Sequence, residues 1–183
     1  MRRFFSAKDV FKTKNIAVMA MMAALHFVLS QFTIYLSPTF KAITFSYLPG
    51  AIVAILYGPW AALAFGFVAD TIGFIAKPVG PYFIGYAVSE MLANFTYAAF
   101  LYRKPVSLVR VLLSRLVITA VVTFGLNYLW NAIMYGSAAS AYFTSVRLIN
   151  NLAQLPVYVA LIMFFGRLAL RLDRTEFFRA KSS

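Results

Sequence analysis

Polar side chains gather around one turn between two long apolar segments, in the stretch from residue 127 to residue 151. Such groups are costly in or near hydrocarbon unless they line a polar cavity. Asparagine offers a hydrogen-bond donor and an acceptor to the amide edge of a heterocycle. Tryptophan provides a surface for stacking, and arginine can form a bidentate pair with a carboxylate. We therefore predict a small-molecule site here, formed by Arg147, Trp130, Asn127, Asn131, Asn150 and Asn151. Hydrogen bonding between helices is the alternative for the asparagines.

Two acidic residues, Asp70 and Glu90, are expected within the membrane layer. Paired carboxylates could carry protons or assist hydrolysis. However, the chain has no nucleophile motif, no phosphate-binding loop and no cysteine, and its lone histidine, His26, does not make a metal site. We predict no catalytic residue, metal or cofactor. Asp70 could accept hydrogen bonds from an amino-heterocycle or pair with Lys77, whereas Glu90 suits a buried partner.

The elements that must position these residues are membrane helices. The chain is 62% hydrophobic and only 12% charged, against about 25% charged in soluble domains. Apolar runs of about 20 residues, the length of a bilayer span, recur through the chain. The sequence predicts an all-α membrane protein, one domain over residues 1–183, with six spans at about 15–31, 45–56, 60–76, 82–101, 111–134 and 144–170. Pro49-Gly50 should interrupt the second span, and Pro156 lies in the sixth.

Basic residues set the predicted orientation. The net charge is +12, and most of the positive charge lies before the first span, in the mid-chain connection that holds Arg103 to Arg115, and at the C-terminus. An even number of spans puts these clusters on one side, which the positive-inside rule makes cytoplasmic. Topology thus accounts for the charge without nucleic acid. Three cations fall outside, where they could attract an anion to one mouth: Lys41, Lys77 and Arg147.

Several segments resemble a known family: AMMAA (20–24), the apolar loop at 32–44, YLPGAIVAILYGP (47–59), GFVADTIGFIAKPVGPYFIGY (66–86), NYLWNAIMYG (127–136) and VRLINNLAQLP (146–156). Together they are similar to the substrate-binding S-components of bacterial energy-coupling factor (ECF) vitamin transporters, most of all the folate-specific branch. The resemblance implies a multi-pass protein of the bacterial cell membrane. It also implies an outward vitamin pocket beneath the loop after the first span, which would act as a lid.

The same resemblance implies the partners and a pocket built by spans four to six, whereas the roles of individual residues are hypotheses from residue type and side of the membrane. Ala20 and Ala24 would pack on a transmembrane coupling protein that joins two cytoplasmic ATPases, so ATP hydrolysis would occur on other subunits. Folate carries a flat pterin and a glutamate with two carboxylates. Trp130 with Tyr82 or Phe83 could stack the ring. The pterin edge could form hydrogen bonds with Asn127, Asn131 and Asp70. The carboxylates could be bound or attracted by Arg147, Lys41 and Lys77.

Three other functions stay open on the sequence alone. The chain could be an S-component for another anionic vitamin or precursor. It could be an intramembrane enzyme that uses Asp70 and Glu90. It could also be a solitary secondary transporter, although its small size and lack of an evident repeat argue against that.

Overall fold

The computed structural model describes residues 13–32, 34–35, 41–43, 45–76 and 82–182 of the 183-residue chain. Nearly all of these residues are helical, in six segments that follow the predicted spans. They are α2 (Thr13–Gln31), α3 (Tyr47–Tyr57), α4 (Pro59–Ala76), α5 (Ile84–Leu101), a continuous rod of α6 (Leu108–Val117), η1 (Ile118–Leu126) and α7 (Asn127–Tyr135), and α8 (Ser137–Ser182). The predicted helical architecture is confirmed over this part of the chain.

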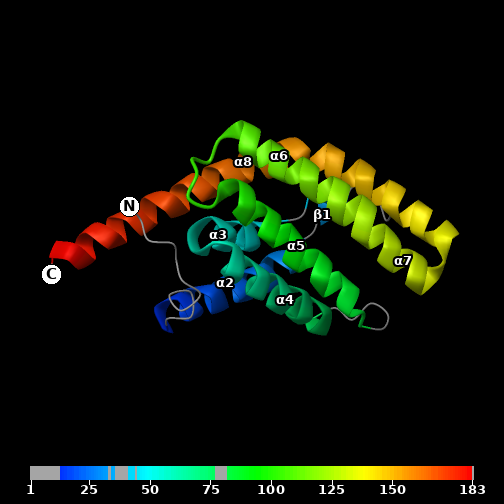
Figure 1. Ribbon diagram of the computed structural model, residues 1–183, viewed down its shortest axis with the longest axis horizontal. Coiled ribbons are helices and arrows are strands. Elements are labelled where there is room, and N and C mark those ends of the chain that lie inside the picture. Colours follow the sequence, from blue (N-terminus) through cyan, green and yellow to red (C-terminus); the bar gives the residue numbers. More distant parts are fainter. Residues whose placement is uncertain (1–12, 33, 36–40, 44, 77–81, 183) are drawn as a thin grey trace.

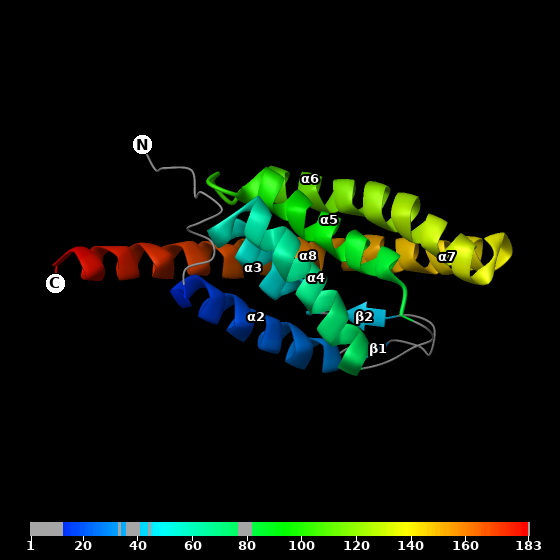
Figure 2. The same cartoon turned by 60° about the horizontal axis from the view of Figure 1, so that its bottom comes forward.

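The short helix α3 lies at the centre of the bundle and contacts α2, α4, α5 and α8. Helices α2 and α4 lie on one side of α5, and the α6–η1–α7 rod and α8 lie on the other (Figure 1). A small hairpin of β1 (Ile34–Tyr35) and β2 (Lys41–Ile43) precedes α3. The hairpin and the α7–α8 turn lie toward one end of the bundle, and the last part of α8 projects from the other end (Figure 2).

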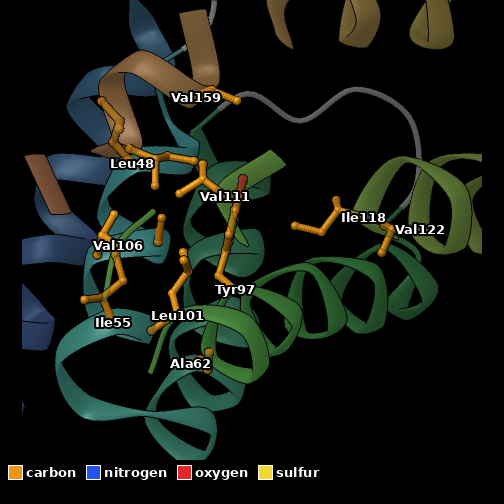
Figure 3. Close-up of a cluster of buried hydrophobic side chains, with 14 residues drawn as sticks. Leu48, Ile55, Ala62, Tyr97, Leu101, Val106, Val111, Ile118, Val122 and Val159 are labelled. Atoms are coloured by element: carbon orange, nitrogen blue, oxygen red, sulfur yellow. The ribbon is translucent and has the colours of Figure 1, made fainter. Parts of the chain in front are cut away.

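A hydrophobic core joins α3, α5, the α6–η1 rod and α8. Leu101 and Val111 are fully buried, and Tyr97 is 2% exposed. Figure 3 shows the Tyr97, Leu101 and Val111 side chains gathered between the helices, with Leu48 and Ile55 from α3 nearby. Burying such side chains contributes roughly 1.5–3 kcal/mol each. This core holds α3 in place, and α3 begins at the site described below.

The outer surface of the bundle is apolar. Large hydrophobic side chains are exposed along α2, α4, α5, the rod and α8, including Met21 at 70%, Ile75 at 73% and Phe164 at 65%. Exposed apolar area on this scale indicates a surface that another apolar phase covers. Two helices, Leu108–Tyr135 and Ser145–Leu172, are long and apolar enough to cross a membrane. Three shorter apolar helices accompany them, Asn15–Gln31, Tyr47–Tyr57 and Pro59–Ile75.

Two expected breaks differ in the structure. Pro49 and Gly50 do not interrupt α3, because they lie in its first turn, where the missing proline N–H would be unbonded anyway. The expected outer turn of several residues between the fifth and sixth spans is a single glycine. Gly136 has a φ of 87°, a conformation that favours glycine, and its N–H caps α7 by binding the Ala132 carbonyl at 3.1 Å. Arg147 therefore lies well inside α8 rather than at a helix start.

Candidate binding site

A polar cavity of about 520 Å³ lies among the helices of the bundle. It receives side chains from α2, α3, α4, α5, α7 and α8, and from the segments that lead into α3 and α5. Its volume is in the range of small-molecule sites. The lining residues are His26, Ser46, Tyr47, Ala69, Asp70, Gly73, Phe74, Tyr82, Phe83, Tyr86, Glu90, Tyr135 and Arg147.

Four residues predicted from the sequence line this cavity: Asp70, Tyr82, Phe83 and Arg147. The Arg147 side chain is exposed and makes no hydrogen bond or ion pair with any described residue, so its guanidinium is available to an anion. Phe74 and Tyr82 meet edge to face, with ring centroids 5.0 Å apart. The cavity thus combines a cation, two carboxyl groups and several aromatic walls.

Trp130 lies behind the wall of the cavity rather than among its lining residues. Its indole packs against Phe83 with centroids 5.6 Å apart, and its Nε1 donates to Ser89 Oγ at 3.1 Å. Gly85 permits this approach, since a Cβ there would meet Trp130 Cδ2 at 2.7 Å. In this arrangement Trp130 supports Phe83, and its predicted stacking on a ligand stays a prediction.

Asn131 also sits one layer behind the cavity. It is 2% exposed, and its Oδ1 accepts a hydrogen bond from the Tyr86 hydroxyl at 2.6 Å. The Asn131 Nδ2 and the Asn127 Oδ1 are buried and have no hydrogen-bond partner within the described residues. Such groups are expensive to leave unpaired, so both amides are available to a further partner.

Asn151 belongs to a separate buried layer centred on Arg115. Arg115 was expected in the mid-chain connection, but the structure buries it in α6 with 6% exposure. Its Nη1 donates to the Tyr97 hydroxyl at 2.7 Å and its Nη2 to Asn151 Oδ1 at 3.1 Å. The guanidinium carbon lies 3.8 Å from the centroid of the Tyr158 ring and 5.6 Å from that of Tyr47.

The remaining predicted residues fall elsewhere. Asn150 follows Arg147 along α8 and is half-buried, but it does not line the cavity. Lys77 and the side chain of Lys41 lie outside the described residues. Ala20 and Ala24 are exposed on α2, and Ala20 lines a shallow apolar groove between α2 and α4.

The sequence reading missed several lining residues, chiefly His26, Tyr47 and Tyr135. Glu90 also lines the cavity, although the sequence suggested for it a buried partner or, together with Asp70, an enzymatic role rather than ligand binding. A signal existed on α5, because Phe83, Tyr86 or Ala87, Glu90 and Asn94 recur at helical spacing. Tyr47 and Tyr135 gave no such signal, since aromatic residues make up 17% of the chain and recur throughout it.

Comparison with known proteins identifies the family. A family model described as "ECF transporter, substrate-specific component" matches residues 14–165. A folate transporter FolT of Clostridium novyi (strain NT) is 31% identical over 163 residues, covering 88% of this chain and 94% of the relative. A folate transporter FolT of Leuconostoc mesenteroides subsp. mesenteroides is 27% identical over 157 residues, covering 83% of this chain and 84% of the relative.

A solved structure agrees with these matches. The crystal structure of FolT bound with folic acid superposes with a TM-score of 0.73 at 31% identity, covering 85% of this chain and 94% of that one. These proteins are transporter components rather than enzymes. The chain belongs to the family of substrate-specific components of ECF transporters.

Proposed function

We propose that this chain is the folate-binding S-component of an ATP-driven ECF importer, which captures folate at the outer face of a bacterial cell membrane and delivers it to the cytoplasm. The observation that carries the proposal is the cavity in which Arg147 and aromatic side chains meet. The names of the relatives and the folic acid complex of a similar structure support folate as the ligand.

The cavity suits the two halves of folate. Arg147 can bind a glutamate carboxylate through two parallel hydrogen bonds. Phe83 and Tyr86, whose ring centroids are 6.0 Å apart, offer faces and edges to a flat pterin. Trp130 holds Phe83 from behind, and Asn131 holds the Tyr86 hydroxyl. The aromatic walls are therefore pre-organised, which reduces the entropy lost on binding.

Titration with folic acid tests the ligand. The purified chain should bind folic acid at least about tenfold more tightly than other anionic vitamins such as biotin and pantothenate, because these lack a pterin to meet the aromatic walls. Mass spectrometry of the molecule that co-purifies with the chain gives an independent answer. Preference for biotin or pantothenate would reassign the chain to another vitamin.

The proposed orientation puts the cavity outside and both chain ends in the cytoplasm. The natural chain contains no cysteine, so single cysteines can report sidedness. Ser137 at the start of α8 and Lys104 in the α5–α6 connection are both exposed. We expect an impermeant maleimide to label Ser137→Cys in intact cells and Lys104→Cys only after lysis. The reverse pattern would place the cavity in the cytoplasm and remove the proposed direction of transport.

We further propose that α2 docks on a transmembrane coupling protein joined to two cytoplasmic ATPases. Exposed Ala20 and Ala24 lie one turn apart, a spacing that lets helix backbones approach closely. Ala20→Arg should leave folic acid binding intact while blocking assembly and uptake. Met21→Arg is the matched control, because Met21 is 70% exposed on a neighbouring face of the same helix. Equal assembly by both variants would exclude this contact.

A further inference from the structure

The cavity has an acceptor side as well as a cationic side. His26 on α2 and Asp70 on α4 line it from one side of α5, whereas Tyr135 on α7 and Arg147 on α8 line it from the other (Figure 1). Glu90 projects from α5 itself. Asp70 and Glu90 lie near enough for their charges to interact. Within the described residues, neither acid forms an ion pair with Arg147.

Glu90 is held in one orientation by Asn94, one turn further along α5. Asn94 Nδ2 donates to the Glu90 backbone carbonyl at 2.9 Å and to Glu90 Oε1 at 3.2 Å. Asn94 is 2% exposed. Its side chain fits only because residue 50 is glycine, since a Cβ there would overlap Asn94 Oδ1 and approach its Cγ to 3.0 Å. The second carboxylate oxygen of Glu90 makes no hydrogen bond within the described residues.

A buried histidine nitrogen without a hydrogen-bond partner also lines this side of the cavity, which indicates that a ligand could bind there. His26 is 9% exposed, it lines the cavity, and its Nδ1 has no hydrogen-bond partner among the described residues. No group of three or more His, Cys, Asp or Glu side chains suited to a metal ion occurs in that part of the chain. Carboxylate oxygens that do not bind a metal accept hydrogen bonds from N–H donors, and the His26 ring offers a polar atom to the same ligand.

We infer that Glu90, oriented by Asn94, accepts the N–H donors of an aminopyrimidine-type ring. The cavity would thereby select a ligand with a donor-bearing heterocycle at one end and an anion at the other. A carboxylate accepts two adjacent N–H groups, and hydrogen bonds to an ionised acceptor are the stronger kind. A site built in this way rejects an analogue that lacks the donor, because its own acceptor is left unpaired. The inference rests on the proposed function and names which part of folate each side of the cavity would read.

The test compares folic acid with its 2-deamino analogue, which lacks one donor of the ring edge. Wild-type chain should lose about 10- to 100-fold in affinity for the analogue. In Glu90→Gln the ratio between the two ligands should shrink below about threefold, whatever happens to overall affinity. Glu90→Asp keeps the carboxylate and should give an intermediate ratio. The ratio does not respond to a general loss of stability, so it isolates recognition of the amino group.

The orienting role of Asn94 is tested through Gly50. Gly50→Ala displaces the Asn94 amide without touching Glu90 and should reduce the ligand ratio toward that of Glu90→Gln. Gly125→Ala is the matched control, because its nearest neighbouring atom would be 3.9 Å away, and it should keep the wild-type ratio. A wild-type ratio in Glu90→Gln would overturn the inference while folate binding stands. Failure of the wild-type chain to bind folic acid would remove both.

Discussion

Two arginines of this bundle have opposite surroundings. Arg147 lines the cavity, is exposed, and makes no hydrogen bond or ion pair with a described residue. Arg115 is 6% exposed and is enclosed by the Tyr97 hydroxyl, the Asn151 amide and the faces of Tyr158 and Tyr47. No carboxylate is among the partners of either guanidinium in the described residues.

The difference separates a cation that is available to an anion from a cation whose hydrogen bonds are already made within the bundle. A buried guanidinium is expensive unless hydrogen bonds and aromatic faces replace its water, and Arg115 has both. These contacts connect α6 with α5 and α8. Tyr47, which lies against the Arg115 guanidinium, also lines the cavity. Arg147 lacks such partners and is free to meet a ligand. The Arg115 layer and the cavity thus share one residue, Tyr47.

Arg115→Ala should give the largest effect, and the effect should be on stability. The change leaves the Tyr97 hydroxyl and the Asn151 amide oxygen unpaired and opens a void, so we expect the free energy of unfolding to fall by about 2–5 kcal/mol. Thermal unfolding in detergent measures it. Arg115→Lys keeps the charge without the planar fork and should fall between. A variant with unchanged stability but weakened folic acid binding would show that Arg115 belongs to the binding site.

Arg147→Ala should reverse that pattern. Loss of a charge-assisted hydrogen bond to a carboxylate should weaken folic acid binding about 10- to 100-fold. The unfolding temperature should stay within about 2 °C of wild type, because this side chain bonds to no described residue. Calorimetric titration and thermal unfolding of the same sample measure both. Arg147→Lys should recover part of the affinity. Wild-type affinity in Arg147→Ala would show that Arg147 does not bind folic acid, and the proposed difference in role between the two arginines would be wrong.

Ser89→Ala probes the wall between the two regions and should have the smallest effect. It removes the acceptor of the Trp130 indole and should cost about 1 kcal/mol of stability and less than about fivefold in affinity. Ser114→Ala is the control, because Ser114 is also buried but its hydroxyl donates to the Val111 carbonyl of its own helix. An affinity loss as large as that of Arg147→Ala would mean that Trp130 itself contacts the ligand.

The sequence indicated the helices better than their ends and faces. Long apolar runs marked the six helical segments because burial and lipid exposure both require apolar residues. The α7–α8 turn was placed over too many residues, since small residues suggest a turn although the alanines among them are good helix formers. Arg115 was assigned to a connection because charge alone does not distinguish a loop from a buried cage of tyrosines.

Part of the site was predictable, because charged residues are conspicuous among apolar ones. Asp70 and Arg147 stood out as charges in apolar surroundings, and the structure brings both to one cavity. The side of the rod on which Asn127 and Asn131 lie, compared with Arg115, depends on the intervening segment η1. Residues 118–126 of this segment are π-helical. Bonds from i to i+5 turn the chain differently from an α-helix, and the residues of this segment carry no local signal for them.

The length of α8 has a mechanical consequence. The helix runs unbroken from Ser137 to Ser182 and carries Arg147 in its first third, while its last part projects from the bundle (Figure 2). Pro156 lies between and supplies no N–H to the Leu152 carbonyl, so the rod is least stiff there. If a bound molecule displaces Arg147, the displacement would be transmitted along α8 toward its C-terminal part. Bending at Pro156 would determine how much of that displacement reaches the other end of the helix.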